Sequence, residues 1–244
     1  MQRRNRLSGW DERLIDSLLD FLSRTSRPAE GSPSERVKFV GYYDLLELLK
    51  TPGCPVCSII RRSSLHYLNT MFVQQLNSME FREPVRESMG YCSKHSELVR
   101  GIARRTLPRM GITVVYQEIL ETAEWKLKHE TEVPLPSNCH LCSLESDLEE
   151  YAVRLIADHL GDDEFQRRFL ASEGVCLPHM RLIGTQLQGS RAKFFLSAER
   201  QILDRLLSEL HEFVCKHDHR FSRQEFSAAE ASSWKRAVHF FVGA

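Results

Sequence analysis

The sequence predicts an all-α fold, in which a multi-helix unit is duplicated and each copy is stapled by a metal site of three cysteines and one histidine. Three observations lead to this prediction. Apolar residues recur at helical spacing, whereas alternating strand patterns are scarce, with residues 112–115 as the one brief candidate. Six of the seven cysteines fall in two copies of a CxxC…CxxH pattern. Landmarks outside the ligands repeat as well.

The ligand pattern occurs twice, with an offset of 85 residues between the CxxC pairs and 84 residues between the CxxH pairs. The candidate ligands are Cys54, Cys57, Cys92 and His95 in the first copy and Cys139, Cys142, Cys176 and His179 in the second. Three thiolates and one imidazole form the ligand set of a closed, tetrahedral zinc site. We therefore predict two bound zinc ions.

The duplication extends beyond the ligands. A serine follows each CxxC, a Glu-Phe pair lies between CxxC and CxxH, and a Ser-x-Gly sequence precedes each CxxH. These positions are Ser58, Glu80, Phe81, Ser88 and Gly90 in the first copy, and Ser143, Glu164, Phe165, Ser172 and Gly174 in the second. Matched landmarks of this kind indicate duplicated subdomains rather than two chance metal motifs.

Three segments are expected along the chain. Residues 1–36 comprise an N-terminal amphipathic helix at 10–24, followed by a polar, flexible linker. Residues 37–133 form the first metal-binding helical repeat, and residues 134–244 form the second, which ends in a C-terminal helix. A hydrophobic content of 42% supports a core in addition to the metal sites.

The helices of the first repeat are expected at 41–50, 58–76, 79–88, 92–103 and 112–131. Gly90 suits a left-handed cap after the third of these, and Pro108 with Gly111 is expected to break the chain before the last. The second repeat is expected to follow the same plan, with helices at 143–160, 162–172, 176–187 and 190–216, a polar loop at 217–230 and a final helix at 231–241.

The ligands can be paired in more than one way. We favour one site within each repeat, because each duplicated unit should fold around its own ion. A cross-braced arrangement would instead give one site of four thiolates and one of two thiolates with two imidazoles. The metal is predicted to be zinc; an iron–sulfur cluster and a pair of redox-active CxxC dithiols stay open as alternatives.

Two further groups of residues could carry chemistry. His140, inside the second CxxC, could be an extra ligand or an acid–base group, but an outward-pointing residue is the simpler interpretation. Cys215, His217 and His219 could form a third cluster, but a helix end with solvated polar side chains is again simpler. No nucleophile–base pair stands out, so we predict no catalytic residues and favour a protein that is not an enzyme.

Charge and hydropathy narrow the function class. The chain has 33 Lys and Arg against 33 Asp and Glu, whereas broad phosphate recognition usually requires a basic excess. No apolar run approaches the roughly 18–20 residues that span a bilayer. Acidic residues also interrupt the N-terminal region where a secretion signal needs a continuous apolar stretch. We therefore expect a cytoplasmic protein without a membrane partner, in a reducing compartment that suits clustered cysteines.

These motifs resemble an uncharacterised prokaryotic family of unknown function, whose members carry twin CxxC…GxCxxH motifs and a C-terminal segment rich in Asp, Arg, Phe and Trp. The matching residues are the eight candidate ligands with Gly90 and Gly174, and, in the tail, His217, Asp218, Arg220, Phe221, Ser233, Trp234, Arg236, Ala237 and Gly243. The resemblance covers about residues 40–244. It implies metal binding and a prokaryotic cytoplasmic setting, and it implies no particular activity.

The sequence thus predicts a non-catalytic, zinc-binding helical scaffold that presents a surface to a protein partner. Two alternatives stay open. The density of cysteines would also suit an iron–sulfur or thiol redox protein. The ligand type, together with a small basic cluster at Arg100, Arg104, Arg105 and Arg109, would suit a nucleic-acid-associated zinc protein.

Overall fold

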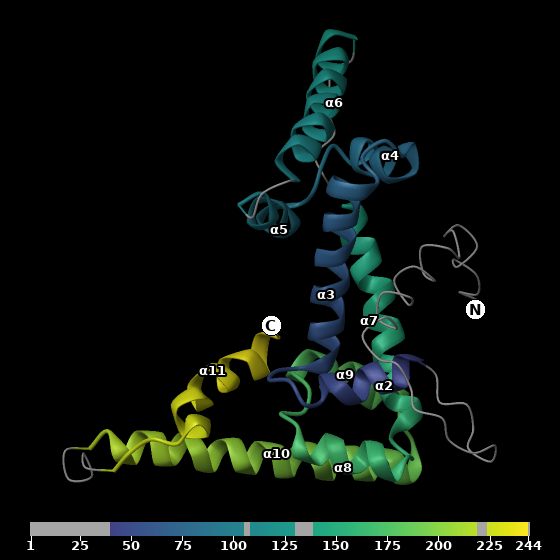
Figure 1. Ribbon diagram of the computed structural model, residues 1–244. Helices are drawn as coiled ribbons and strands as arrows, with labels where there is room; N and C mark the ends of the chain where they lie inside the picture. The colour runs from purple at the N-terminus through teal and green to yellow at the C-terminus, as the bar shows by residue number, and fades with distance from the viewer. Residues whose placement is uncertain (1–39, 105–107, 130–138, 219–223, 244) are drawn as a thin grey trace. The chain divides into compact units, whose positions relative to one another are not determined.

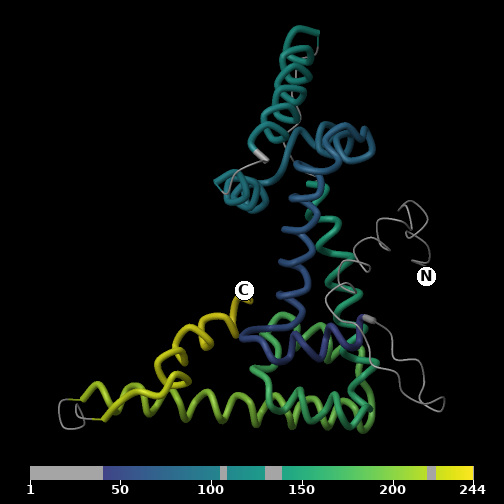
Figure 2. The backbone as a smooth tube through the Cα atoms, in the orientation of Figure 1, coloured from purple at the N-terminus to yellow at the C-terminus, as the bar shows by residue number. Residues whose placement is uncertain are grey.

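The computed structural model describes residues 40–104, 108–129, 139–218 and 224–243. Across these four ranges the regular structure is entirely helical, and no strand occurs in them, so the predicted all-α class is confirmed. The helix expected at 10–24 lies outside the described residues. The backbone from the first described helix to the last can be followed in Figure 2.

Each helix expected between residues 41 and 241 is present within about four residues of its predicted ends. The helices are α2 (Val40–Leu48), α3 (Pro55–Asn69), the π-helical turn η1 (Thr70–Gln74), α4 (Met79–Glu87), α5 (Ser93–Ala103), α6 (Pro108–His129), α7 (His140–His159), α8 (Asp163–Ala171), α9 (Leu177–Gln186), α10 (Gly189–Lys216) and α11 (Ala228–Val242).

The start of α6 differs from the prediction. Pro108 was expected to break the chain, but it occupies the first turn of the helix, where a fixed φ and a missing N–H cost nothing. Gly111 lies inside α6, and glycine is required there because a Cβ would collide with the carbonyl oxygen of Phe72. Residues 112–115, the one candidate strand, are therefore helical.

The chain forms two compact units. Of the described residues, unit A contains those at 40–58 and 151–243, and unit B contains those at 59–150. These units differ from the predicted division into 37–133 and 134–244, because α3 begins in unit A and ends in unit B, whereas α7 begins in unit B and ends in unit A. Each unit therefore combines one part of each sequence repeat.

The core of unit A is aromatic. Phe165 and Phe169 of α8 stack at 5.8 Å between ring centroids, and Phe169 lies 5.9 Å from Phe195 of α10. Asp162 caps α8 by accepting a hydrogen bond from the Phe165 amide, and it also accepts one from the Tyr42 hydroxyl. Figure 1 shows α8 alongside α10, and α11 starting next to α10 and leading obliquely away from it toward the C-terminus.

The core of unit B is built from η1, α4, α5 and α6. Met71 and Phe72 of the π-helical turn are fully buried, and Phe72 faces Tyr91 at 6.4 Å. Phe81, the landmark of the first repeat, is buried 6.0 Å from Tyr67. In the part of the chain that the structure describes, no helix is both long and apolar enough to cross a membrane.

Candidate metal centres

The structure brings the eight predicted ligand residues together in two groups of four. Site A comprises Cys54, Cys57, Cys176 and His179, and site B comprises Cys92, His95, Cys139 and Cys142. Within each group the candidate ligand atoms all lie within 4.8 Å of one another. Site A lies wholly in unit A and site B wholly in unit B.

The predicted pairing within each repeat is wrong. Site A joins the CxxC of the first repeat to the CxxH of the second, and site B does the reverse, so the cross-braced alternative is wrong as well. The reason is the length of the helices that follow each CxxC. Residues 55–74 are continuously helical, which takes the chain roughly 30 Å from Cys54. The next CxxH therefore belongs to unit B, where it meets a different CxxC.

The spacing in site A fits a single tetrahedral ion. The Nδ1 atom of His179 lies 3.4 Å from the sulfurs of Cys54 and Cys57 and 3.0 Å from that of Cys176. The Cys57 and Cys176 sulfurs are 3.8 Å apart. Metal–sulfur bonds of about 2.3 Å in a tetrahedron place sulfurs about 3.8 Å apart and sulfur about 3.6 Å from nitrogen. The thiols match this figure and the imidazole contacts are slightly shorter.

Site B has the same geometry. The Nδ1 atom of His95 lies 3.3 Å from the sulfurs of Cys92 and Cys139 and 3.4 Å from that of Cys142. The Cys92 and Cys142 sulfurs are 3.7 Å apart. Both sites therefore offer three thiolates and one Nδ1 atom to an ion of the same size, with no fifth protein ligand in either group of described residues.

Helix N-termini present the ligands at both sites. Cys92 and Cys176 are the N-cap residues of α5 and α9, and each histidine sits one turn into the helix that its cysteine begins. Cys54 and Cys139 directly precede α3 and α7, and their carbonyl groups accept hydrogen bonds from the amides of Ser58 and Ser143. The positive ends of four helix dipoles therefore point at the thiolates and favour their charged form.

The Ser-x-Gly landmarks make the turn that delivers each CxxH. Gly90 and Gly174 have φ values of +101° and +70°, a region that glycine enters without strain. A Cβ on Gly174 would approach the carboxylate of Glu199 to 2.8 Å. The left-handed cap predicted at Gly90 lies one residue earlier, at Met89 with φ +55°, and Gly90 follows it and donates its amide to the Val85 carbonyl. The turn in the second repeat is built differently, because Ser172 is extended and its hydroxyl accepts a hydrogen bond from the Gly174 amide.

A carboxylate supports the histidine of site B. The Nε2 atom of His95, which faces away from the thiols, lies 3.0 Å from Glu145 Oε2, although not along the direction of an ideal hydrogen bond. Glu145 also accepts hydrogen bonds from Ser64 and Lys94. Burial raises its pKa, but these donors outweigh that effect and hold the pKa below its usual value. A carboxylate on the outer nitrogen fixes the tautomer and orientation of a metal-bound histidine.

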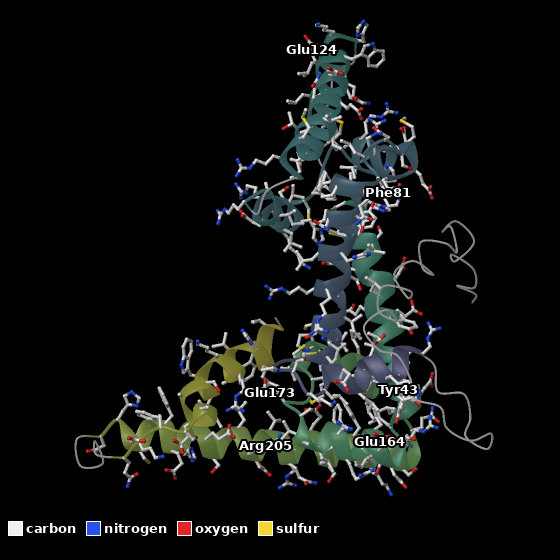
Figure 3. The ribbon with its side chains drawn as sticks, in the orientation of Figure 1. Tyr43, Phe81, Glu124, Glu164, Glu173 and Arg205 are labelled. Atoms are coloured by element: carbon white, nitrogen blue, oxygen red, sulfur yellow. The ribbon has the colours of Figure 1, made fainter. Side chains whose placement is uncertain are left out.

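A different carboxylate supports site A. Glu173 accepts a hydrogen bond from the Gly53 amide at 2.7 Å, which ties the turn before Cys54 to the turn before Cys176. Glu173 also lies 3.8 Å from Arg236 of α11, which is paired with Glu209 of α10. Arg205, labelled with Glu173 in Figure 3, donates to the carbonyl groups of Leu170 and Ser172 in the same turn. The long helix α10 thereby holds the CxxH segment in place.

Sequence reasoning missed these supporting acids. Glu145 lies three residues after Cys142, but the equivalent position in the first repeat is Ile60, so the duplication gave no sign of it. Glu199, whose carboxylate accepts the Val175 amide at 3.0 Å, is equivalent to Val115. Only Glu145 could have been found from the sequence, because it lies one helical turn beyond the ligand Cys142 and so points toward the same side of the helix.

Burial and mutual contact keep the thiols of Cys54 and Cys142 protonated in the absence of an ion. The pKa of Cys54 is raised far above its ordinary value by hydrogen bonding with Cys176 and Cys57 and by burial. Burial, followed by the contact with Cys92, raises the pKa of Cys142 to about 12. Burial lowers the pKa of His179, but hydrogen bonding with Cys176 and Cys57 outweighs it and brings the value to about 10. A bound metal ion reverses this balance, since a coordinating thiol is deprotonated.

The other sequence candidates lie outside both sites. His140 is half-buried, with its ring 5.6 Å from that of Tyr67, so it is not the outward-pointing residue we expected. Burial lowers its pKa. Cys215 is exposed, and His217 contacts the Phe213 carbonyl oxygen and the rings of Phe213 and Phe226 at the end of α10. His219 lies outside the described residues.

The cavity beside site A is small. It has a volume of about 40 Å³ and is bordered by Cys54, Cys176, Glu199, Arg236 and His239, among others. This volume corresponds to about three water molecules.

Comparisons with known proteins place the chain among uncharacterised relatives. Residues 129–244 match the model of the Family of unknown function (DUF6062). An uncharacterised 23.9 kDa protein encoded in the xynA 3′ region of Caldicellulosiruptor sp. (strain Rt8B.4) is 22% identical over 209 residues, which cover 82% of this chain and 99% of that protein. No solved structure matches the chain. Over residues 129–244 the chain thus resembles an uncharacterised domain family.

Proposed function

We propose that the protein is a non-catalytic, two-zinc helical scaffold, in which one ion staples each unit and the folded surface serves a protein partner. The observation that carries the proposal is the closed ligand set of each site. Three thiols and one imidazole nitrogen lie at the corners of a tetrahedron of zinc–thiolate size, once in unit A and once in unit B. Structural zinc sites have this composition and leave no open position for substrate.

The same spacing supports zinc over the alternatives stated from the sequence. An iron–sulfur cluster attaches its cysteines to different iron atoms, so its ligating sulfurs lie farther apart than the corners of one tetrahedron. Ligand atoms within 4.8 Å of one another instead suit a mononuclear ion.

Elemental analysis of anaerobically purified protein tests the metal content. We expect two zinc ions per chain and a colourless protein, because both ligand sets are complete. Iron in place of zinc, with a brown colour, would replace the proposal with the iron–sulfur alternative. One ion or none would show that the thiol groups are not metal sites.

A protein partner is the second part of the proposal, and it is supported by α11. Trp234, Val238 and Phe241 lie at helical spacing on one side of this helix and are 49%, 55% and 64% exposed. The test compares proteins retained by the wild-type chain with those retained by Trp234→Asp. We expect a defined partner to be lost in this variant and kept by Ser208→Asp, which places the same charge on an exposed position of α10. Identical retention by all three chains would contradict a role for α11.

A further inference from the structure

Sites A and B provide an internal comparison, because they have the same ligand geometry and differ in access to solvent. The duplication makes Cys57 equivalent to Cys142 and Cys176 equivalent to Cys92. The sulfur–sulfur distance is 3.8 Å in the pair of site A and 3.7 Å in the pair of site B. In site A both cysteines are buried, whereas in site B Cys142 is exposed and Cys92 is half-buried.

The end of α11 covers the pair in site A. Gly243, at the C-cap of α11, comes so close that an added Cβ would lie 3.1 Å from the Cys57 sulfur and 3.7 Å from the Cys176 sulfur. Arg236, about two helical turns earlier, anchors α11 to Glu209 of α10. The pair in site B faces solvent at Cys142, while Cys139 and His95 behind it are buried.

Both cysteines of the pair in site B lie at the start of a helix. Cys92 is the N-cap of α5, and Cys142 lies in the first turn of α7, so both sulfurs are near the positive end of a helix dipole. Oxidation is selective for thiolates that are accessible and have a second thiol within reach. Of the two equivalent pairs, only Cys92 and Cys142 meet both conditions.

We propose that Cys92 and Cys142 form an oxidisable pair, which a peroxide converts to a disulfide with release of the ion from site B, while site A keeps its ion. This inference rests on the proposed zinc binding and adds its regulation. Loss of two of four ligands leaves Cys139 and His95, which are too few to retain the ion. The consequence is a protein whose unit B responds to peroxide and whose unit A does not.

The chemistry balances with hydrogen peroxide as the oxidant. One thiolate attacks a peroxide oxygen, the O–O bond breaks, and a proton from solvent completes a sulfenic acid and one water. The second thiolate attacks the sulfenic sulfur, the S–S bond forms, and the departing hydroxide takes a second proton to become water. The two sulfurs lose two electrons in total, the peroxide gains two, and the metal ion leaves unchanged in charge.

The test uses the zinc-loaded full chain carrying Cys215→Ser, because Cys215 is the exposed cysteine outside both sites. Hydrogen peroxide is added in steps, released zinc is measured with a chromophoric chelator, and disulfides are mapped by mass spectrometry. We expect one of two zinc ions to leave at least about tenfold faster than the other, together with a Cys92–Cys142 disulfide. N-ethylmaleimide on the untreated zinc protein should label Cys142 before Cys57.

Three outcomes would overturn the inference: release of both ions at one rate, a Cys57–Cys176 disulfide forming first, or zinc retained by both sites. Zinc content is measured before peroxide is added, so failure of the proposed function is seen separately, as a protein without two zinc ions at the start. Failure of the inference alone leaves that initial content at two and changes only the order of release or the disulfide that forms.

Discussion

Glu145 is the side chain that most clearly distinguishes the two metal sites. It lies 3.0 Å from the outer nitrogen of His95 and is held by Ser64 and Lys94. We predict that Glu145→Gln weakens zinc binding at site B by about 10- to 100-fold, because an amide orients a ligating histidine less strongly than a carboxylate. Competition with a chromophoric chelator measures the affinity, and site A in the same chain serves as the reference.

A matched control for Glu145 is available in α5. Glu97→Gln removes an acid two residues from His95 whose partner is Arg100 on the surface. This variant should leave both zinc affinities within about twofold of the wild type, since exposed ion pairs contribute little. Equal losses at site B in the two variants would mean that any nearby negative charge suffices and that Glu145 has no positioning role.

Glu199 makes the stability of unit A depend on pH. Burial raises its pKa from the ordinary 4.5 to about 7, although the hydrogen bond from the Val175 amide opposes the shift. The protonated side chain therefore stabilises the fold below about pH 4.5, and this stability is lost as the pH rises through about 7. The difference between wild type and Glu199→Gln isolates this effect from the titration of the metal ligands. As the pH rises from 4.5 to 8, we expect the free energy of unfolding of Glu199→Gln to increase by up to about 3 kcal/mol relative to that of the wild type. A constant difference would contradict the prediction.

The individual residues differ in how far the sequence revealed them. The eight candidate ligands were visible because cysteine and histidine at fixed spacing are rare, and the pattern occurs twice. Glu145 and Glu199 were hidden, because their repeat equivalents Ile60 and Val115 are apolar and a glutamate is ordinary in an amphipathic helix. Their roles depend on burial and on contacts with other helices, which spacing alone does not show.

The helix α11 acts on site A through its last turn. Gly243 has φ +78° and ψ −179°, a combination that is almost restricted to glycine, and its backbone lies against the sulfurs of Cys57 and Cys176. We predict that Gly243→Ala costs about 1–3 kcal/mol of stability and speeds loss of zinc from site A. Chelator-induced release, resolved into its two phases, measures the effect.

Gly189→Ala provides the control for backbone strain alone. Gly189 has φ +59°, but a Cβ there would meet nothing within 4 Å. This variant should lose some stability without changing the rate of zinc release. Faster release in Gly189→Ala as well would show that general destabilisation, rather than the cover over Cys57, controls the exchange of zinc.

The positions of the helices were predictable from the sequence, whereas the exact residues at which some of them begin were not. Periodic apolar residues located α8, α9 and α10 to within one or two residues. The predicted starts of α3 and α7 came three residues late, because both helices begin inside a CxxC, at Pro55 and His140. The early starts have a consequence for the sites, since they place Cys57 and Cys142 in the first turn, within reach of the helix dipole.

The pairing of the two repeats was not predictable from the pattern. Two identical ligand sets can close within a repeat or exchange their halves, and the sequence is the same in both cases. What decides between them is that α3 with η1, and likewise α7, carry the chain roughly 30 Å away before the next CxxH. Each unit is then completed by the other repeat, so neither repeat contains a whole metal site.

Pairs of ligand substitutions test this exchange across the whole chain. If Cys57 and Cys176 share site A, the variant with both changed to serine loses one ion and keeps the other at site B. Changing Cys57 and Cys92 to serine removes one ligand from each site, so both ions should be held weakly and lost on dialysis against a moderate chelator. Pairing within each repeat would give the opposite results, because Cys57 and Cys92 would then share one ion.

Hydrogen exchange distinguishes loss of an ion from collapse of the whole fold in these double variants. With Cys57 and Cys176 changed, protection should fall around site A and persist in the helices of unit B, including α5 and α6, because site B is complete within residues 59–150. The exchanged pairing requires that this variant keeps one zinc ion, at site B, and that the protection of α5 is unchanged. Loss of protection in α5 to the same degree as in α9 would show that the two metal sites do not stabilise their units independently.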